Sequence, residues 1–538
     1  MDGLLGLADE LLLKILHAAG APAVGRAATL CRRLRHAQQQ LAALPAFASA
    51  AVLDSGKEVG ECVRGAVTEA LAAMPAAVDV CLLFVARGAR GRARGADPLA
   101  GLVPLCQELL PPGTPVVGCC GRGLFGVQGG APVELDPSEA GRRGASVLLC
   151  RLPDAQLRTF AAQDAPAGGW ASAEAVRSWL GLGPGDAPPT SCLLFTQPSV
   201  GEAVHDCVAG VGAALPDMLL TGGISSGAGE LFCSQPPPQQ PEAQGEAAAV
   251  DGSGVAGRQG SAAPQRPCYV GLLVWRQGWD DAPGGGAAGS RKRTMRCAGL
   301  TVHGLEGVEP LLTQLEVTRN LGVLQHVNDD TGQLIEEVEM LGLSGAQTVQ
   351  GGDAAVLLRR LARGSAELGL WAAPCTDPGS LRAAVCADEP VVKLQLYGEG
   401  DLVMATASDT EALEAVLDRS RQPGHVLCAQ PLGHTAESVC RELTAALGKL
   451  TAALPPRHAL LPTHNCGLVV VSCTAKGRQM FEAVGVEAEA IHAASRGLPL
   501  AGVYCDGEIG PIAQLDSQQK RCAVQGFSTI LTALAGMP

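Results

Sequence analysis

Residues 465–511 read NCGLVVVSCTAKGRQMFEAVGVEAEAIHAASRGLPLAGVYCDGEIGP, and this stretch decides the fold of the second half of the chain. The apolar, β-branched run at 468–471 predicts a buried strand. A turn at 474–477 and a helical period follow, and then a second short strand is predicted over 500–504, before the glycine-rich turn 505–511. This order favours a parallel crossover, which places the carboxyl ends of both strands on one side of a sheet.

The two predicted strand ends carry polar side chains that are candidates for a binding site. Cys473 and Lys476 follow the first strand, Tyr504 ends the second, and Glu508 lies in the glycine turn. We expect these side chains to line one sheet edge, where Lys476 and Glu508 bring opposite charges to a cleft suited to a zwitterion or a short peptide. A nearby cation lowers a thiol pKa, so Cys473 is either a reactive thiol or an inert core cysteine. Glu508 either binds an amine or guanidinium or caps backbone amides.

The same segment resembles the end of a FIST domain, a sensory module whose name joins F-box and intracellular signal transduction. That family closes with C-x-G-R-G and then G-x-x-x-x-G-E-I-G, and the second signature is nearly intact over 502–510. In the first signature Cys473 and Gly477 are kept, whereas Lys476 replaces the arginine and Ala475 replaces a glycine. The resemblance, together with the glycine turn near 120, implies ligand-binding residues at Cys473, Lys476, Gly477, Tyr504, Gly507, Glu508 and Arg122.

The first 45 residues predict two short amphipathic helices, separated by Gly20 and Pro22. This segment resembles an F-box, which begins L-P-x-E-[LI]-L-x-x-I-L and ends near C-R-x-W; here Ala8 replaces the proline and Leu34 the tryptophan. The resemblance implies adaptor-binding residues at Leu7, Glu10, Leu11, Leu12, Ile15, Leu16, Cys31 and Leu34. Two such helices are too small to hold a core alone, so the alternative is a helical hairpin packed on the main body.

The fold class that we expect is α+β. The predicted layout is a helical F-box-like module at 1–45, a FIST N-terminal domain at 50–280 and a FIST C-terminal domain at 294–538. Residues 234–267 contain almost no large apolar side chain and predict a disordered insertion within the first of these sheet domains.

Local patterns predict individual elements within this layout. The alternating run at 391–397 predicts a strand, and the apolar spacing at 435–450 predicts an amphipathic helix. A small apolar helix is predicted over 527–534. The strands at 231–233 and 269–275 are expected to pair across the insertion, because lengthening a loop costs little entropy.

Two glycine turns, at 118–123 and 222–227, each follow an apolar strand and form a weak internal repeat. The first makes Arg122 a candidate for anion binding. The second contains G-x-S-x-G around Ser225, the pattern of a hydrolase nucleophile elbow, but that elbow needs a helix directly after the serine and a strand is predicted instead. A structural turn is the better interpretation.

Composition limits the classes of function. Lys plus Arg number 40 and Asp plus Glu 53, a net charge of −13, and aromatic residues make up 3% of the chain. This acidic balance disfavours nucleic acid and anionic membranes as partners. No secretory signal, transit peptide or membrane-length apolar run is evident. The 20 cysteines then indicate reduced core thiols in a cytoplasmic or nuclear protein, and His458, His464 and Cys466 lack the second ligand pair of a zinc site.

The resemblances imply a non-catalytic protein without metal or cofactor: the substrate-recognition subunit of an SCF-type (cullin-RING) ubiquitin ligase. A Skp-type adaptor and a cullin would be its partners, and the FIST body would bind a protein substrate or a small ligand. The alternative is a FIST-type intracellular sensor of a small ligand without a ligase role. A serine hydrolase that uses Ser225 is the less favoured third hypothesis.

Overall fold

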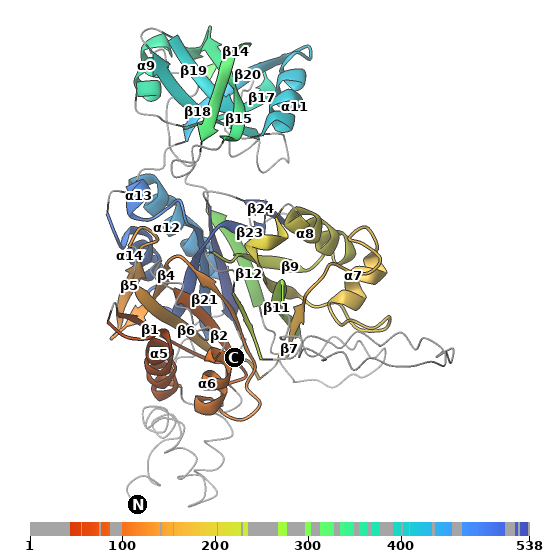
Figure 1. The fold of residues 1–538 in the computed structure, drawn as a ribbon, viewed down its shortest axis with the longest axis vertical. Helices are drawn as coiled ribbons and strands as arrows, with labels where there is room; N and C mark the ends of the chain where they lie inside the picture. Colours follow the sequence, from red (N-terminus) through yellow and green to blue (C-terminus); the bar gives the residue numbers. More distant parts are fainter. Residues whose placement is uncertain are drawn as a thin grey trace, which may run out of the picture. The chain divides into compact units, whose positions relative to one another are not determined.

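The computed structural model describes most of the chain after residue 43, with gaps (Figure 1). The described residues are 44–54, 56–74, 77–86, 99, 101–139, 142–153, 155–201, 203–226, 230–234, 267–276, 296–302, 312–327, 334–348, 354–363, 367–375, 391–399, 402–407, 409–432, 436–453, 465–481, 483–511, 522–525 and 528–535. The F-box-like segment and almost all of the predicted insertion lie outside them.

The chain divides into two compact units, and the fold is mixed α+β with sheets dominating the described residues. The first unit holds the described residues up to Thr301 together with those of Ala446–Pro511 and Leu515–Pro538; the second holds those of Val302–Ala445. These boundaries differ from the predicted domains 50–280 and 294–538. The reason is strand pairing, because the end of the chain joins the sheets of the first 300 residues.

Three modules of similar order build the first unit, each with two parallel strands beside an antiparallel one. The first comprises β1 (Ala46–Asp54), α5 (Val59–Ala73), β2 (Val80–Ala86), α6 (Leu102–Leu109), β3 (Val116–Gly121) and β6 (Arg143–Arg151). The second comprises β7 (Ala155–Ala162), α7 (Ala173–Trp179), β8 (Ser191–Thr196), the short helix η1 (Pro198–Val200), α8 (Ala203–Ala214), β9 (Leu219–Ile224) and β11 (Tyr269–Arg276).

The third module begins with β12 (Arg296–Val302), and the second unit follows it in the sequence. After the second unit, the third module continues with the part of α12 (Ala436–Ala453) from Ala446 onwards, and with β21 (Cys466–Cys473), α13 (Arg478–Phe481), α14 (Val486–Ala494), β22 (Leu500–Cys505) and β25 (Thr529–Ala535). β21 and β22 pair in parallel from Leu468 with Leu500 to Cys473 with Cys505, which confirms the predicted crossover.

Each module extends an arm that pairs with the sheet of another module. β4 (Leu124–Gln128) and β5 (Ala131–Leu135) follow β3 and join β22, whereas β10 (Leu231–Cys233) follows β9 and joins β3. β23 (Gly507–Pro511) and β24 (Cys522–Gln525) follow β22 and join β9. The three sheets have the orders β1-β6-β2-β3-β10, β7-β11-β8-β9-β23-β24 and β12-β25-β21-β22-β4-β5. The exchange is cyclic, so each module completes another's sheet.

A glycine stands at the same place in β3, β9 and β22, where an arm crosses. A Cβ added at Gly118, Gly222 or Gly502 would lie 1.8, 1.7 or 2.3 Å from a backbone oxygen of the neighbouring strand. Only glycine permits this approach. The two predicted glycine turns are therefore two copies of a threefold repeat, and the third copy lies in the segment that opened the sequence analysis.

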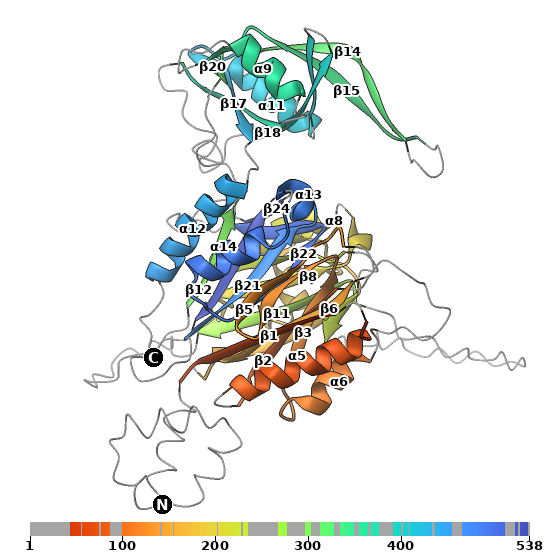
Figure 2. The same ribbon diagram turned by 90° about the vertical axis from the view of Figure 1, so that its left-hand side faces the viewer.

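The three sheets share one inner core, and helices cover the outer faces of the first two sheets. Phe84, Phe195 and Val471 come from different sheets and belong to the same buried cluster. α5 and α6 pack on the first sheet and α7 and α8 on the second; Figure 2 shows α5 lying along its strands. Burial of each large apolar side chain contributes about 1.5–3 kcal/mol. Side chains alternate along each strand, so neighbouring residues of β21 face opposite sides.

The second unit contains an eight-stranded sheet with two helices on one face. Its elements are β13 (Leu312–Thr313), β14 (Glu316–Val327), β15 (Leu334–Ser344), β16 (Gln347–Thr348), α9 (Ala354–Arg363), β17 (Glu367–Pro374), β18 (Val391–Glu399), β19 (Leu402–Ala407), α11 (Thr410–Ser420) and β20 (His425–Leu432). Leu358 of α9 and Val416 of α11 pack against the strands. Asp409 caps α11 by accepting a 2.8 Å hydrogen bond from the Ala412 amide.

Several local predictions are confirmed and two are wrong. β18 and α12 lie where the sequence predicts them. The predicted helix at 527–534 is strand β25, because its short apolar run fits either period and pairing with β21 decides the outcome. β10 and β11 do not pair: β10 joins β3, and β11 joins β7 and β8. Arm exchange between modules overrides the local hairpin.

Candidate functional site

The parallel pairing of β21 and β22 brings the predicted site residues to one end of a sheet, but divides them between its two faces. Val471 and Val503 lie in the shared inner core, so Cys473 continues the inner face of β21. Ser472 and Tyr504 lie on the outer face, towards α14 and β5. All of these side chains are buried. Proximity in the sheet therefore does not produce one common cleft.

The outer cluster consists of Ser472, Lys476, Glu487 and Thr529. Lys476 Nζ lies 3.2 Å from Glu487 Oε1, and both side chains are 0% exposed. Lys476 also donates to Thr529 Oγ1 at 2.6 Å, and Thr529 donates to Glu487 Oε1 at 2.5 Å. Ser472 Oγ donates to Glu487 Oε2 at 2.9 Å. A buried ion pair of this kind needs such added hydrogen bonds to offset desolvation.

Glu134 lies beside this cluster on the arm strand β5. Tyr504 donates its hydroxyl proton to Glu134 Oε1 at 2.9 Å, and the Ala488 amide of α14 donates to Oε2 at 3.4 Å. Burial, and secondarily the negative charge of Glu487, raises the pKa of Glu134 to about 7. Burial also raises the pKa of Tyr504 well above its usual value. The arm is thus joined to the third module through a carboxyl group that titrates near neutral pH.

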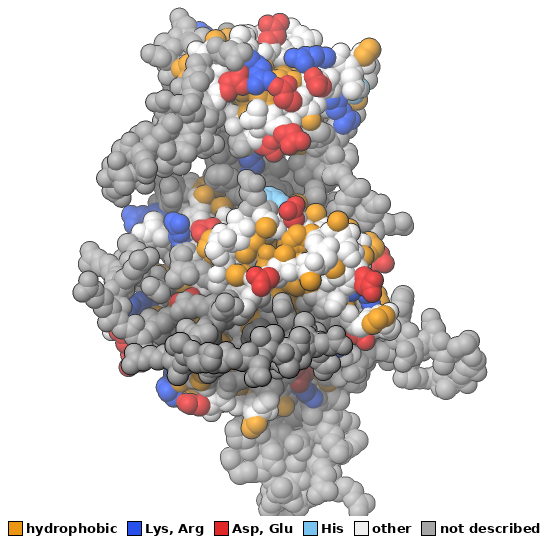
Figure 3. Space-filling model, turned by 45° about the vertical axis from the view of Figure 1, so that its right-hand side comes forward, with side chains coloured by type: hydrophobic (Ala, Val, Ile, Leu, Met, Phe, Trp, Pro, Cys, Tyr) orange, Lys and Arg blue, Asp and Glu red, His pale blue; other side chains and the backbone are white. Residues whose placement is uncertain are grey.

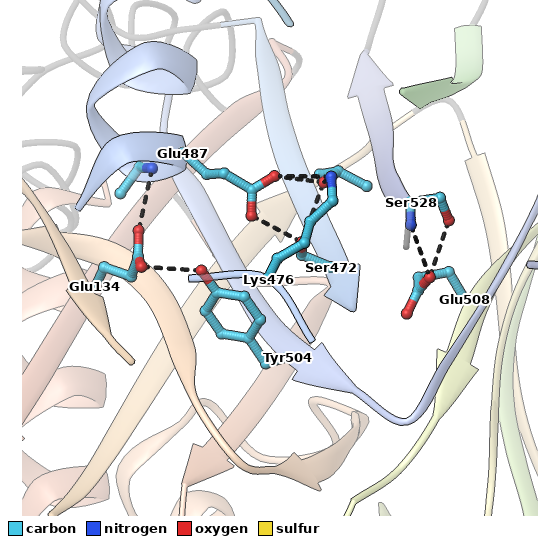
Figure 4. A network of polar contacts seen from close by, with 9 residues as sticks. Glu134, Ser472, Lys476, Glu487, Tyr504, Glu508 and Ser528 are labelled. Carbon is cyan, nitrogen blue, oxygen red and sulfur yellow. Dashed lines mark hydrogen bonds and ion pairs between the residues drawn. The ribbon is translucent and has the colours of Figure 1, made fainter. Parts of the chain in front are cut away.

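Glu508 forms a separate inner cluster with Ser528 and Cys473, as Figure 4 shows for the first two of these residues. Ser528 donates to Glu508 Oε2 through its hydroxyl at 2.9 Å and its amide at 3.2 Å. Burial raises the pKa of Glu508 to about 8, although hydrogen bonds from Ser528 and Cys473 and the charge of Lys476 act in the opposite direction. The other oxygen, Oε1, meets no N–H or O–H donor among the described residues.

The predicted meeting of Lys476 and Glu508 in an open cleft is not what the geometry shows. The ammonium group of Lys476 bonds to Glu487 and Thr529 on the outer face, and Glu508 bonds to Ser528 on the other side of the strands (Figure 4). Sequence reasoning missed Glu487 and Thr529. No local sequence pattern identifies them, because α14 and β25 bring them to Lys476 only in the folded third module.

Arg122 lies at an exposed corner near the same strand ends. Its Nε is 3.5 Å from Asp506 Oδ1, with the two side chains 57% and 28% exposed. Thr474 Oγ1 donates to the same carboxylate at 3.3 Å. Arg122 is therefore paired with an acidic side chain, which reduces its value as a site for an anion.

Three equivalent backbone hydrogen bonds join the modules where their strand ends meet. They are Arg122 N to Tyr504 O at 3.2 Å, Ser226 N to Cys120 O at 3.1 Å and Asp506 N to Ile224 O at 3.0 Å. Each module donates to one module and accepts from the other, so the contacts close a ring. The backbone amides of the residues after the three glycines therefore bond to neighbouring modules and join the three sheets.

The two predicted glycines of the site have structural reasons. Gly477 has a φ of +80°, and a Cβ there would lie 2.4 Å from Asp136 Oδ2. Asp136 is buried and accepts hydrogen bonds from the Arg478 and Ser138 amides. Gly507 pairs with Ile224 where β23 joins β9. Both glycines allow close approach between modules.

Ser225 is buried, and its Oγ has no hydrogen-bond partner among the described residues. A nucleophile elbow needs a helix directly after the serine, whereas the next described element after Ser225 is strand β10, from Leu231. The described residues also contain no cluster of three side chains able to hold a metal ion. Cys466 is buried at the start of β21, whereas His458 and His464 lie outside the described residues.

The described surface carries mixed charge. On the face drawn in Figure 3, acidic and basic side chains are interspersed on the second unit, and hydrophobic side chains gather in the region of α7 and α8. Among the described helices, none combines the length and hydropathy that crossing a membrane requires. The polar side chains of the predicted site, such as Lys476, Glu487 and Glu508, are buried inside the first unit.

No family model matches the chain. An uncharacterized protein of Mycobacterium bovis is 33% identical over 97 residues, which is 18% of this chain and 24% of that protein. An uncharacterized protein of Mycobacterium tuberculosis is 35% identical over 82 residues, 15% of this chain and 21% of that protein. The chain thus spans about a quarter or less of the curated relatives that it matches. These matches do not test the FIST and F-box resemblances, which stay predictions.

Proposed function

We propose that this chain is a non-catalytic recognition protein, the substrate-recognition subunit of an SCF-type ubiquitin ligase. Residues 1–45 would bind a Skp-type adaptor, which links the chain to a cullin, and the body would bind a protein substrate. The observation that carries the proposal is the F-box-like sequence placed directly before β1. That strand begins at Ala46 and is the edge strand of its sheet.

The polar groups at the predicted site favour a binding role over a catalytic one. Lys476 and Glu487 are buried and bonded to each other, and Ser225 lacks the strand-turn-helix context of a nucleophile. A reactive group must reach its substrate, and these groups lie beneath the surface. Their contacts stabilise the junction of the modules.

A small-ligand sensor is the second candidate, and Glu508 is the observation that favours it. A carboxyl group with a pKa of about 8 is largely protonated at neutral pH, and its Oε1 meets no N–H or O–H donor among the described residues. Buried polar groups normally have partners, so a ligand with a hydrogen-bond acceptor would suit this position. Adaptor binding separates the two candidates, because a sensor without a ligase role does not need it.

The test is direct binding of the full chain to a purified Skp-type adaptor. We expect micromolar or tighter binding, and we expect the double variant Leu12→Asp and Ile15→Asp to lose it. The variant places two charges at positions where burial of each apolar side chain would contribute about 1.5–3 kcal/mol to binding. The control variant, Leu12→Met with Ile15→Met, keeps the apolar face and should bind. Absence of wild-type binding to any such adaptor would refute the ligase role.

A further inference from the structure

The arm formed by β4 and β5 is attached to the third module by a short strand pairing and by buried side chains of β4, among them Phe125, whose ring centroid lies 4.4 Å from that of Tyr504. β4 pairs with β22 at two positions, Leu124 with Val503 and Phe125 with Gly502. β5 lies at the edge of the sheet, outside β4. The end of the arm is held by the hydrogen bond from the Arg478 amide to Asp136 and by the contacts of Glu134 with Tyr504 and the Ala488 amide. Glu134 thus lies where the outer strand of the arm meets both β22 and α14.

The charges around Glu134 are unequal in number. Glu134 is 8% exposed, and Glu487 and the Lys476 side chain are fully buried. If both carboxyl groups were ionised, two negative charges would share one ammonium group in a site removed from water. That ammonium bonds to Glu487 at 3.2 Å and makes no hydrogen bond to Glu134. Tyr504 and the Ala488 amide donate to this carboxyl group, but no cation among the described residues bonds to it. Ionisation of Glu134 in the closed arm is therefore costly, and the closed arm favours the protonated form.

We propose that Glu134 is a proton-dependent latch that holds the β4–β5 arm and α14 together when protonated and loosens them when it ionises. This property is independent of the ligase proposal. The arm would then have a closed state with Glu134 protonated and a loosened state with Glu134 ionised. A partner that binds the loosened arm would cause Glu134 to release its proton to solvent. The device uses only contacts within the third module's sheet and its covering helix.

Several charged or titratable groups around Glu134 raise or lower its pKa. Tyr504 on β22 and the amides of Ala488 and Gly485 donate hydrogen bonds that favour the ionised form of Glu134, while the charge of Glu487 on α14 disfavours it. Asp136, in the turn after β5, adds negative charge near Tyr504. Lys476, in the turn after β21, is held by Glu487. Acidic groups outnumber the one cation, so the surroundings favour the protonated form.

The direction of the pH dependence follows from linkage. The pKa of Glu134 is about 7 in the closed arm and near its usual 4.5 when the arm opens. The latch is fully closed below the lower value and weakens as pH rises through the higher one. Opening should therefore increase by up to about tenfold per pH unit between these two values, and level off above pH 7.

Hydrogen exchange of the full chain, corrected for the intrinsic effect of pH, tests the proposal. Amides of β4, β5 and α14 should exchange faster, relative to those of β7 and β8, as pH rises from about 5 to 7. Glu134→Gln mimics the protonated side chain and should remove this trend. Glu108→Gln, a change at an exposed position of α6, should leave it intact.

Tyr504→Phe provides a second variant that does not depend on how Glu134→Gln folds. It removes a hydrogen bond that lowers the pKa of Glu134, so the increase in exchange must extend to higher pH. The proposal fails if exchange of the arm is independent of pH in the wild type. It also fails if Glu134→Gln keeps the wild-type trend, or if β7 and β8 follow the same curve as the arm.

Discussion

The two faces of the β21–β22 pair differ in how completely their buried carboxyl groups are bonded. On the outer face, both oxygens of Glu487 accept hydrogen bonds and Lys476 supplies an opposite charge. On the inner face, Glu508 accepts its N–H and O–H hydrogen bonds on one oxygen only, and its pKa is raised to about 8. A contacting cation offsets the cost of burying a carboxylate, whereas at Glu508, which lacks one among the described residues, burial raises the pKa.

Removing the cation from the outer face should have the largest effect. Lys476→Met leaves Glu487 buried without its counter-charge, which we expect to destabilise the first unit by about 3–5 kcal/mol. Denaturant unfolding measures the loss. Lys449→Met, at an exposed position of α12, is the matched control and should change stability by less than about 0.5 kcal/mol. Equal effects of the two substitutions would mean that the outer ion pair contributes nothing.

Neutralising the inner carboxyl should have a smaller effect that depends on pH. The pKa of Glu508 is raised from 4.5 to about 8, so the wild type should lose stability as pH rises through this window. Glu508→Gln cannot ionise, so its stability should fall less than that of the wild type as pH rises through this window. Melting curves from about pH 5 to 9 measure the difference.

The decisive interval for Glu508 is between pH 7 and 8, above the window of Glu134. Glu134→Gln should leave the slope there unchanged, whereas Glu508→Gln should flatten it. Parallel melting profiles for the wild type and Glu508→Gln would show that this carboxyl does not hold a proton in the folded protein.

Breaking the exposed ion pair at the same strand ends should have the smallest effect. Arg122 and Asp506 are 3.5 Å apart and partly solvated. We expect Arg122→Ala to cost less than about 1 kcal/mol and the loss to shrink in high salt. Asp506→Ala should behave alike in the same unfolding assay. A salt-independent loss as large as that of Lys476→Met would place this corner among the buried, essential contacts.

Much of the local structure was predictable from particular residues. The β-branched run at 468–471 and the short run at 500–504 indicated two strands, and the helical pattern between them indicated a parallel crossover. Two of the three glycine turns were visible as a repeat. The third was recognised only as part of a family signature, because Gly502 lacks the glycines that follow Gly118 and Gly222 within a few residues.

The partners of the site residues were not predictable, and Glu134 shows why. It meets Tyr504 from 370 positions away in the sequence, through an arm that left its own module. Likewise β10 and β11 are close in the sequence but belong to different sheets.

The sequence by itself determined most of the strands and helices and which side chains share a strand face, because hydrophobic periodicity is a local property; β25 is the exception, since its pairing with β21 decided it. Only the tertiary structure decided which strands pair, and therefore that Lys476 meets Glu487 while Glu508 meets Ser528. The physical reason is that backbone hydrogen bonds are alike in every strand. Which strands pair depends on how the three modules pack around one core, and no single segment encodes that packing.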